Sequence, residues 1–172
     1  MKRLFDLLNL TLLLLMGMAV TAAYPRLPAR VPMHFDLAGR PDRWSGRSGL
    51  VVLVVLAAIM TGTLYLIIRL TPKWAVNPRY LNIPRKEEFL RLPAEKQAAY
   101  WAVYREFFAG LAAAVNLLFY LILRGTIRIA EGSASLLPFK LMIPALVVVG
   151  LILVYYTRRL IVMPGRLIRG DE

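Results

Sequence analysis

The sequence predicts an all-α integral membrane protein with four transmembrane helices, cytoplasmic N and C termini, and a short extracytoplasmic loop whose pattern allows a β-hairpin. Hydrophobic residues make up 59% of the 172 residues, which exceeds the roughly 45–50% of an ordinary soluble domain. These residues concentrate in four long runs that contain no charged side chain. We therefore treat residues 1–172 as a single polytopic membrane domain.

The four uncharged runs are 19, 21, 17 and 17 residues long, at 7–25, 48–68, 107–123 and 141–157. A helix needs roughly 20 residues to cross about 30 Å of hydrocarbon, because backbone amides cannot stay unpaired in lipid. Arginines at the ends of the two shorter runs can extend along the helix towards the head groups. We predict spans at about 6–24, 48–69, 106–124 and 140–158.

The first span has one alternative interpretation, a cleaved signal peptide. Lys2 and Arg3 would form its basic end, and the small residues at 19–23 its cleavage region. The apolar stretch is longer than the usual signal core of about 7–15 residues, and Asp6 interrupts the basic flank. A retained signal anchor is therefore the prediction.

The distribution of Lys and Arg sets the predicted orientation. Of the 22 basic residues, 14 lie in the N-terminal tail, residues 69–105 and the C-terminal tail, and 8 lie in residues 26–47 and 124–140. Because basic residues favour the cytoplasmic side, both termini are predicted inside the cell, with the protein in the cytoplasmic membrane. The basic residues that give the net charge of +12 cluster beside the spans. The lipid bilayer is therefore the predicted partner, and nucleic acid is not.

Two rare residue types limit the chemistry. The chain has no cysteine, which excludes disulfides, thiolate metal sites and a cysteine nucleophile. His34 is the single histidine, so a zinc helix with two histidine ligands is excluded as well. We expect no cofactor.

The first loop, residues 25–47, is the most individual stretch of the chain. Prolines at 25, 28 and 32 hold it extended, because each fixes its own φ and restricts the residue before it. Apolar and other side chains alternate over 31–35, the period of a strand with one apolar face. Residues 36–39 then predict a turn in which Gly39 has a positive φ.

The same loop resembles a known family. Residues 28–44 read Pro-x-x-Val-Pro-x-His-Phe-Asp-x-x-Gly-x-Pro-Asp-x-Trp, which is similar to the extracytoplasmic signature of a bacterial membrane domain of unknown function. That domain forms the N-terminal part of the immunity proteins against a sporulation-delaying toxin. The resemblance spans the first two helices and the loop, and it is carried by Pro28, Val31, Pro32, His34, Phe35, Gly39, Pro41, Asp42 and Trp44.

A second stretch, Asn82 to Leu90, is similar to a cytoplasmic Asn-Ile-Pro segment of small proteins that carry this domain. The chain departs from the immunity proteins because no further set of spans is expected after its fourth helix. The resemblance implies a non-enzymatic membrane protein of immunity or sensing type.

The loop supplies the candidate ligand-binding residues, which would recognise a peptide toxin or another envelope component. They are Pro32, His34, Phe35, Asp36, Gly39, Asp42 and Trp44. His34 with Asp36 and Asp42 is also a candidate metal or proton-sensing cluster, because an imidazole beside carboxylates titrates near neutral pH and can ligate a divalent cation. A structural hydrogen bond from His34 is the favoured interpretation, so no metal site is predicted.

Residues 72–105 predict a cytoplasmic amphipathic segment. Pro72 is expected to end the second helix, and the Asn-Pro and Asn-Ile-Pro turns keep the following residues irregular. Pro93 is suited to the start of a helix that continues into the third span. The candidate partner-docking residues are Asn82, Pro84, Lys86 and Phe89; a solvated connector is the alternative.

Polar and small residues inside the spans predict helix packing. Asn116 lies near the middle of the third span and should face the bundle, because an unpaired amide in lipid costs a few kcal/mol. Gly110 and Ala114 belong to a seam of small residues that permits close helix approach, and the second span could meet it with Thr61, Gly62 and Thr63. No ionisable group lies inside the four runs, so a transport pathway has no support.

We therefore expect a non-enzymatic protein that binds its ligand at the extracytoplasmic loop and responds through residues 77–105. Two alternatives remain open from the sequence: a membrane enzyme with an outward-facing His/Asp site, and an accessory subunit of a membrane complex. A membrane-protein partner and a homo-oligomer also remain open.

Overall fold

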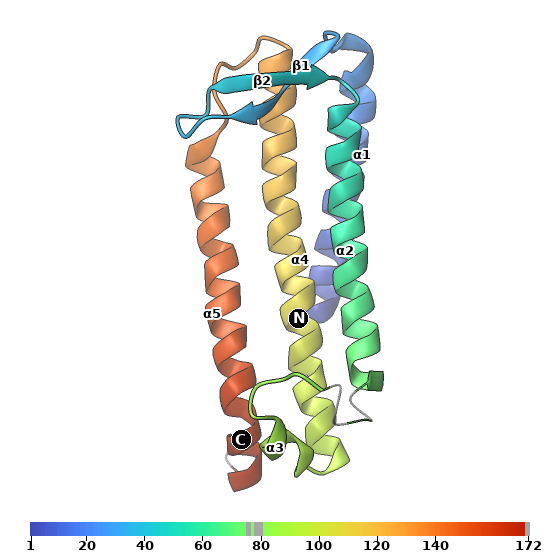
Figure 1. Ribbon diagram of the computed structural model, residues 1–172, viewed down its shortest axis with the longest axis vertical. Coiled ribbons are helices and arrows are strands. Elements are labelled where there is room, and N and C mark those ends of the chain that lie inside the picture. The colour runs from blue at the N-terminus through green and yellow to red at the C-terminus, as the bar shows by residue number, and fades with distance from the viewer. Residues whose placement is uncertain (75–76, 78–80, 171–172) are drawn as a thin grey trace.

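The computed structural model describes residues 1–74, 77 and 81–170. Four long helices lie side by side (Figure 1): α1 (Lys2–Ala23), α2 (Gly49–Trp74), α4 (Ala94–Ala130) and α5 (Phe139–Arg169). Each is long and apolar enough to cross a membrane. The chain is therefore a mostly helical protein of the multi-pass membrane type.

Short elements lie at the two ends of this bundle (Figure 1). At one end, the 3-10 turn η1 (Tyr24–Arg26) leads from α1 into two antiparallel strands, β1 (Arg30–Phe35) and β2 (Pro41–Gly46). At the other end, the short helix α3 (Lys86–Leu90) contacts α5 near the C-terminus. The hairpin and α3 are thus separated by the length of the long helices.

α4 is the central helix, since it packs against α1, α2 and α5. Its small residues Ala109, Gly110 and Ala113 are buried. A Cβ atom on Gly110 would lie 3.2 Å from the ring of Phe5 on α1. The structure thus confirms that the small-residue seam allows a close helix approach.

α4 also joins the two ends of the molecule. It begins at Ala94, directly after the extended backbone of Pro93, and continues for 37 residues. A helix of this length measures about 56 Å, well beyond the roughly 30 Å of hydrocarbon in a bilayer. One rigid element therefore connects the hairpin end with the α3 end.

The end of the second helix differs from the sequence expectation. α2 continues through Pro72 and ends at Trp74. Because Pro72 lies in the last turn, its missing N–H removes a single helical hydrogen bond and leaves the preceding turns intact. The expectation that Pro72 ends the helix is therefore wrong by two residues.

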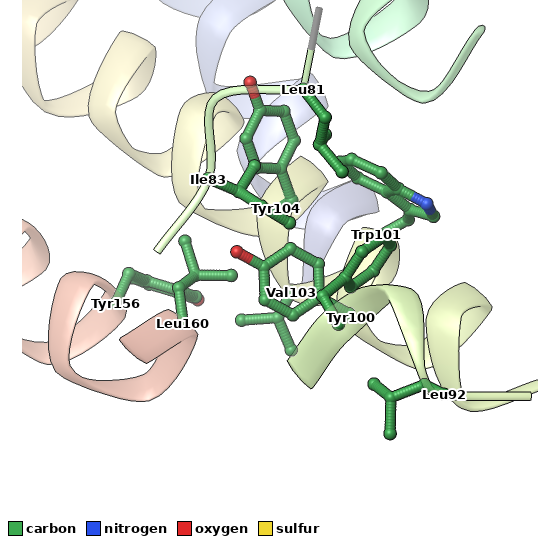
Figure 2. Packing of buried hydrophobic residues seen from close by; sticks show 10 residues of the cluster. Leu81, Ile83, Leu92, Tyr100, Trp101, Val103, Tyr104, Tyr156 and Leu160 are labelled. Carbon is green, nitrogen blue, oxygen red and sulfur yellow. The ribbon is translucent and has the colours of Figure 1, made fainter. Parts of the chain in front are cut away.

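Two clusters of buried side chains fill the ends of the bundle. Beneath the hairpin, aliphatic residues of α1, α2, α4 and β1 meet around Met16, Val31 and Leu123. At the α3 end, an aromatic cluster brings together Tyr100 and Tyr104 of α4 with Tyr156 of α5 (Figure 2). We call the first group the hairpin-end cluster and the second group the aromatic cluster.

Candidate functional site

The β1–β2 hairpin carries most of the predicted site residues. Its strands pair with Val31 opposite Ser45, His34 opposite Arg43 and Phe35 opposite Pro41. The register shifts between Pro32 and Phe35, and such an irregularity interrupts the alternation of a regular strand. Val31 and Pro32, which precede the shift, are both buried although they are neighbours in sequence.

The buried side of the hairpin lies against the helix ends. Val31 is fully buried in the hairpin-end cluster. Met33 packs against the start of α2, where a Cβ atom on Gly49 would lie 2.9 Å from the Met33 sulfur. The hairpin is therefore seated on the bundle by its apolar side.

The tip of the hairpin is a tight turn fixed by Asp36. Its Oδ1 accepts hydrogen bonds from the backbone N–H groups of Ala38 and Arg40, at 2.9 and 2.8 Å. Gly39 has a φ of 78°, which confirms the positive φ predicted for it. Asp36 and Gly39 therefore shape the turn.

The same turn is attached to the connection between α4 and α5. The backbone N–H of Leu137 donates to the carbonyl of Gly39 at 3.1 Å. A Cβ atom on Gly39 would lie 2.8 Å from the Phe139 ring, so the contact requires glycine. The tip of the hairpin consequently rests on the far side of the bundle from α1.

The other end of the hairpin is held by charged side chains. Arg26 of η1 donates to Glu131 at the end of α4 with an N–O distance of 3.0 Å. Arg47, which follows β2, lies over the ring of Tyr24 at 4.8 Å from its centroid. Both ends of the hairpin are thus tied to the helices beneath.

The outward surface of the hairpin is polar and basic. Nδ1 of His34 lies 2.6 Å from Oδ1 of Asp42, and the two side chains are 56% and 43% exposed. Trp44 is 46% exposed, and Leu37 at the tip is fully exposed. The hairpin and the residue after it also carry four exposed arginines, at positions 30, 40, 43 and 47.

The structure divides the seven predicted ligand-binding residues into three groups. His34, Asp42 and Trp44 are exposed, Pro32 is buried and Phe35 is half-buried, and Asp36 and Gly39 build the turn. Among the described residues, no group of three or more acidic or histidine side chains is close enough to hold a metal ion. His34 and Asp42 come together, whereas Asp36 turns to the backbone of its own loop.

A buried polar network joins three helices in the middle of the bundle. Asn116 of α4 is fully buried, which confirms that it faces the bundle. Its Nδ2 donates to Thr61 of α2 at 2.9 Å and to Oδ1 of Asn9 on α1 at 2.8 Å. Asn9 in turn donates to the carbonyl of Ala109 at 3.0 Å. The network ties α1 and α2 to the central helix.

The sequence reasoning missed Asn9, although the signal was present. Asn9 is a lone amide in the first uncharged run, the same observation that singled out Asn116. Its Nδ2 also lies 3.4 Å from the Tyr65 hydroxyl, which donates to Asp6 at 2.5 Å. The polar contacts therefore continue to the start of α1.

The predicted docking residues near α3 fall into two environments. Asn82 and Pro84 are exposed, and Lys86 is half-buried. Phe89 is buried, with its ring centroid 4.9 Å from that of Tyr100 and 5.3 Å from that of Trp101. Phe89 therefore holds the segment on the aromatic cluster, and the exposed neighbours form its surface.

The backbone before α3 has an unusual conformation. Arg85 has a φ of 54° and forms an ion pair with Glu88. A Cβ atom on Gly165 of α5 would lie 2.9 Å from the Arg85 guanidinium and 3.1 Å from the Glu88 carboxylate. The absence of a side chain on Gly165 lets this ion pair lie directly on α5.

Comparison with known proteins finds a similarity over the hairpin and the adjoining parts of α1 and α2. Residues 11–61 match the family described as Domain of unknown function (DUF1648). An uncharacterized protein of Archaeoglobus fulgidus is 28% identical over 146 residues, which cover 67% of this chain and 75% of that protein. No solved structure matches this chain. A membrane domain of unknown function is thus supported.

Proposed function

We propose that the protein is a non-enzymatic receptor of immunity or sensing type in the cytoplasmic membrane, which binds a peptide or envelope component through the hairpin. In this proposal the hairpin faces out of the cell and both termini face the cytoplasm, as the distribution of basic residues predicts. The observation that carries the proposal is the way the hairpin is held. Its tip is attached to the α4–α5 connection at Gly39, the turn before it is joined to Glu131 by Arg26, and it exposes His34, Asp42 and Trp44.

A hairpin fixed in this way favours binding because its exposed groups lose little freedom when a ligand arrives. Trp44 offers a large aromatic surface, a residue type that often dominates binding interfaces. The 2.6 Å contact between His34 Nδ1 and Asp42 Oδ1 holds these two exposed side chains together on the hairpin surface. These features support recognition at the outer surface.

The charge of the hairpin indicates the kind of ligand. Positions 30, 40, 43 and 47 are exposed arginines, while Asp36 is engaged by the turn and Asp42 by His34. The surplus of positive charge favours a ligand with acidic groups, because complementary potentials accelerate and orient association. We therefore propose an anionic peptide or an anionic envelope polymer.

A response inside the cell could pass through α4. This helix contacts β1 at the hairpin end and carries Tyr100 and Trp101 of the aromatic cluster at the other end. A change in the seating of the hairpin would therefore act on the same rigid element that supports α3. The exposed residues Asn82 and Pro84 are the proposed contact for a partner protein there.

Survival after peptide challenge tests the immunity form of the proposal. Bacterial cells that produce the chain are exposed to anionic and cationic membrane-active peptides and compared with cells that lack it. We expect protection against an anionic member of this panel, and we expect Trp44→Ala and His34→Ala to reduce it at equal membrane abundance. Leu141→Ala is the matched control, because Leu141 is an exposed apolar residue of α5 outside the hairpin.

A binding measurement tests the sensing form. The purified protein in lipid nanodiscs is titrated with the same peptides and with an anionic polymer, and the two hairpin variants are titrated beside it. Weaker binding by both variants supports the proposal. Unchanged binding and unchanged protection in both variants would contradict it.

A further inference from the structure

α5 carries a groove that the rest of the bundle does not close. The groove has a volume of about 740 Å³, and every residue that lines it belongs to α5. The groove adjoins the side of α5 that packs on the bundle: Tyr156 and Leu160 are buried in the aromatic cluster, and the groove residues Met163 and Leu167 pack against that cluster. The side of the groove opposite α5 is therefore open and can accept another molecule.

The lining of the groove changes character along the helix. Leu151 and Val154 are exposed apolar residues, 62% and 68% accessible. They are followed by the exposed arginines Arg158, Arg159 and Arg166. Among the described residues, none of these three arginines has a carboxylate within ion-pair distance. The groove therefore has an apolar part and a cationic part.

This order matches the depth profile of a phospholipid. The uncharged run 141–157 measures about 26 Å as a helix, close to the roughly 30 Å of a hydrocarbon core. Arg158 is the first residue after that run, so we expect its guanidinium group near the depth of the lipid phosphates. Tyr155 is 58% exposed just before them, a common position for aromatic rings at the membrane interface.

The spacing of the arginines suits a single head group. Arg159 and Arg166 are seven residues apart, about 10.5 Å along the helix axis, and Val162 lies between them in the lining. A phosphate over Val162 is flanked by cations on both sides. Guanidinium groups bind phosphate with two parallel hydrogen bonds.

We propose that the α5 groove binds one anionic phospholipid, with its phosphate against Arg158, Arg159 and Arg166 and its acyl chain on Leu151 and Val154. A second copy of the chain fits this surface less well. Two-fold packing through the same helix face would place the two sets of arginines opposite each other, and like charges in an interface oppose association.

Native mass spectrometry of the purified full chain tests the proposal. Detergent-solubilised protein is mixed with phosphatidylglycerol or with chain-matched phosphatidylcholine. We expect one phosphatidylglycerol per chain to be retained in preference to phosphatidylcholine. The combined variant Arg158→Gln, Arg159→Gln and Arg166→Gln should lose this preference.

A matched control removes the same charge elsewhere. Arg30→Gln, Arg40→Gln and Arg43→Gln change three exposed arginines of the hairpin and should leave the retention of phosphatidylglycerol unchanged. If the combined groove variant does not fold, Arg159→Gln alone replaces one exposed side chain and should weaken retention roughly fivefold. Circular dichroism shows whether each variant keeps its helices.

Four outcomes of the lipid-retention measurements would overturn the assignment. They are equal retention of the two lipids by the native chain, full retention by the groove variants, loss of retention in the hairpin control, and displacement of the lipid by millimolar inorganic phosphate. The last would show a site for free phosphate. A dimer that dissociates in the groove variants would assign the surface to a second copy and would also contradict the proposal.

Discussion

Asn116 donates a hydrogen bond from its Nδ2 to Oδ1 of Asn9 at 2.8 Å, and this bond connects α4 to α1 in the middle of the bundle. Both side chains are almost fully buried. In hydrocarbon an amide without a partner is costly, and this bond adds to those that Asn116 makes with Thr61 and Asn9 with the carbonyl of Ala109. This pair fixes how α1 and α4 face each other at mid-depth.

A double-mutant cycle on this pair should show coupling between the two helices. Asn9→Ala and Asn116→Ala should each lower the free energy of unfolding, and the coupling should be about 0.5–2 kcal/mol, the range of hydrogen bonds between helices in membranes. Unfolding in mixed micelles of detergent and dodecyl sulfate measures it. Thr63→Ala is the control, because the Thr63 hydroxyl is exposed and donates to its own helix at Ile59. Coupling near zero would contradict this account.

The contact between Gly110 and Phe5 predicts an overpacking effect. Gly110→Leu should destabilise the bundle by about 1–3 kcal/mol, because its side chain would displace the Phe5 ring that lies 3.2 Å from a Cβ at this position. Gly150→Leu is the matched control. It offers the same gain in helix propensity, but a Cβ atom at Gly150 would meet nothing within 4 Å. In the same unfolding assay, Gly110→Leu should have a lower free energy of unfolding than Gly150→Leu. The reverse order would be inconsistent with a close approach of α1 and α4.

Gly39 at the hairpin tip can be compared with Gly132, which follows α4, because both have a positive φ. Gly39 and Gly132 have φ values of 78° and 75°, so alanine at either position should cost about 1–2 kcal/mol for the left-handed backbone. Only Gly39 also contacts Phe139; a Cβ on Gly132 would meet nothing within 4 Å.

Hydrogen exchange at the Leu137 amide, which donates to Gly39, should therefore accelerate strongly in Gly39→Ala. The same amide should change little in Gly132→Ala. Equal exchange in the two variants would mean that the tip is not attached to the α4–α5 connection.

The buried ring of Phe89 is expected to stabilise the segment around α3. Phe89→Ala removes a buried ring that contacts Tyr100 and Trp101, and such truncations cost about 3–5 kcal/mol in a well-packed core. Residues 81–92 should then exchange their amides faster and become sensitive to protease. Glu87→Ala, on the exposed side of α3, should leave both measurements unchanged. Protection that survives Phe89→Ala would argue against the aromatic cluster as the anchor.

The long helices and the inward side of Asn116 could be predicted from sequence because both follow from one local rule. Lipid offers no hydrogen-bond partners, so an uncharged run of sufficient length indicates a helix, and a lone amide within it indicates a buried contact. Asn9 obeys the same rule and could have been found. The positive φ of Gly39 also followed from its turn.

Other features depend on residues that are distant in the chain. Nothing near Gly39 in the sequence indicates Phe139 or Leu137, which lie about 100 positions away. The register shift after Pro32 reflects how the strand settles on the helix ends. Phe89 stands among charged residues, so its burial becomes evident only when Tyr100 and Trp101 are placed beside it.

Site-directed labelling tests most directly the central claim that the hairpin is presented outside the cell and the α3 segment inside. The chain has no cysteine, so Leu37→Cys at the hairpin tip and Glu87→Cys on α3 each introduce a unique thiol at an exposed position. A membrane-impermeant maleimide should label the first variant in intact cells and the second only after lysis. Labelling of both from the same side, or of Glu87→Cys alone in intact cells, would contradict the account.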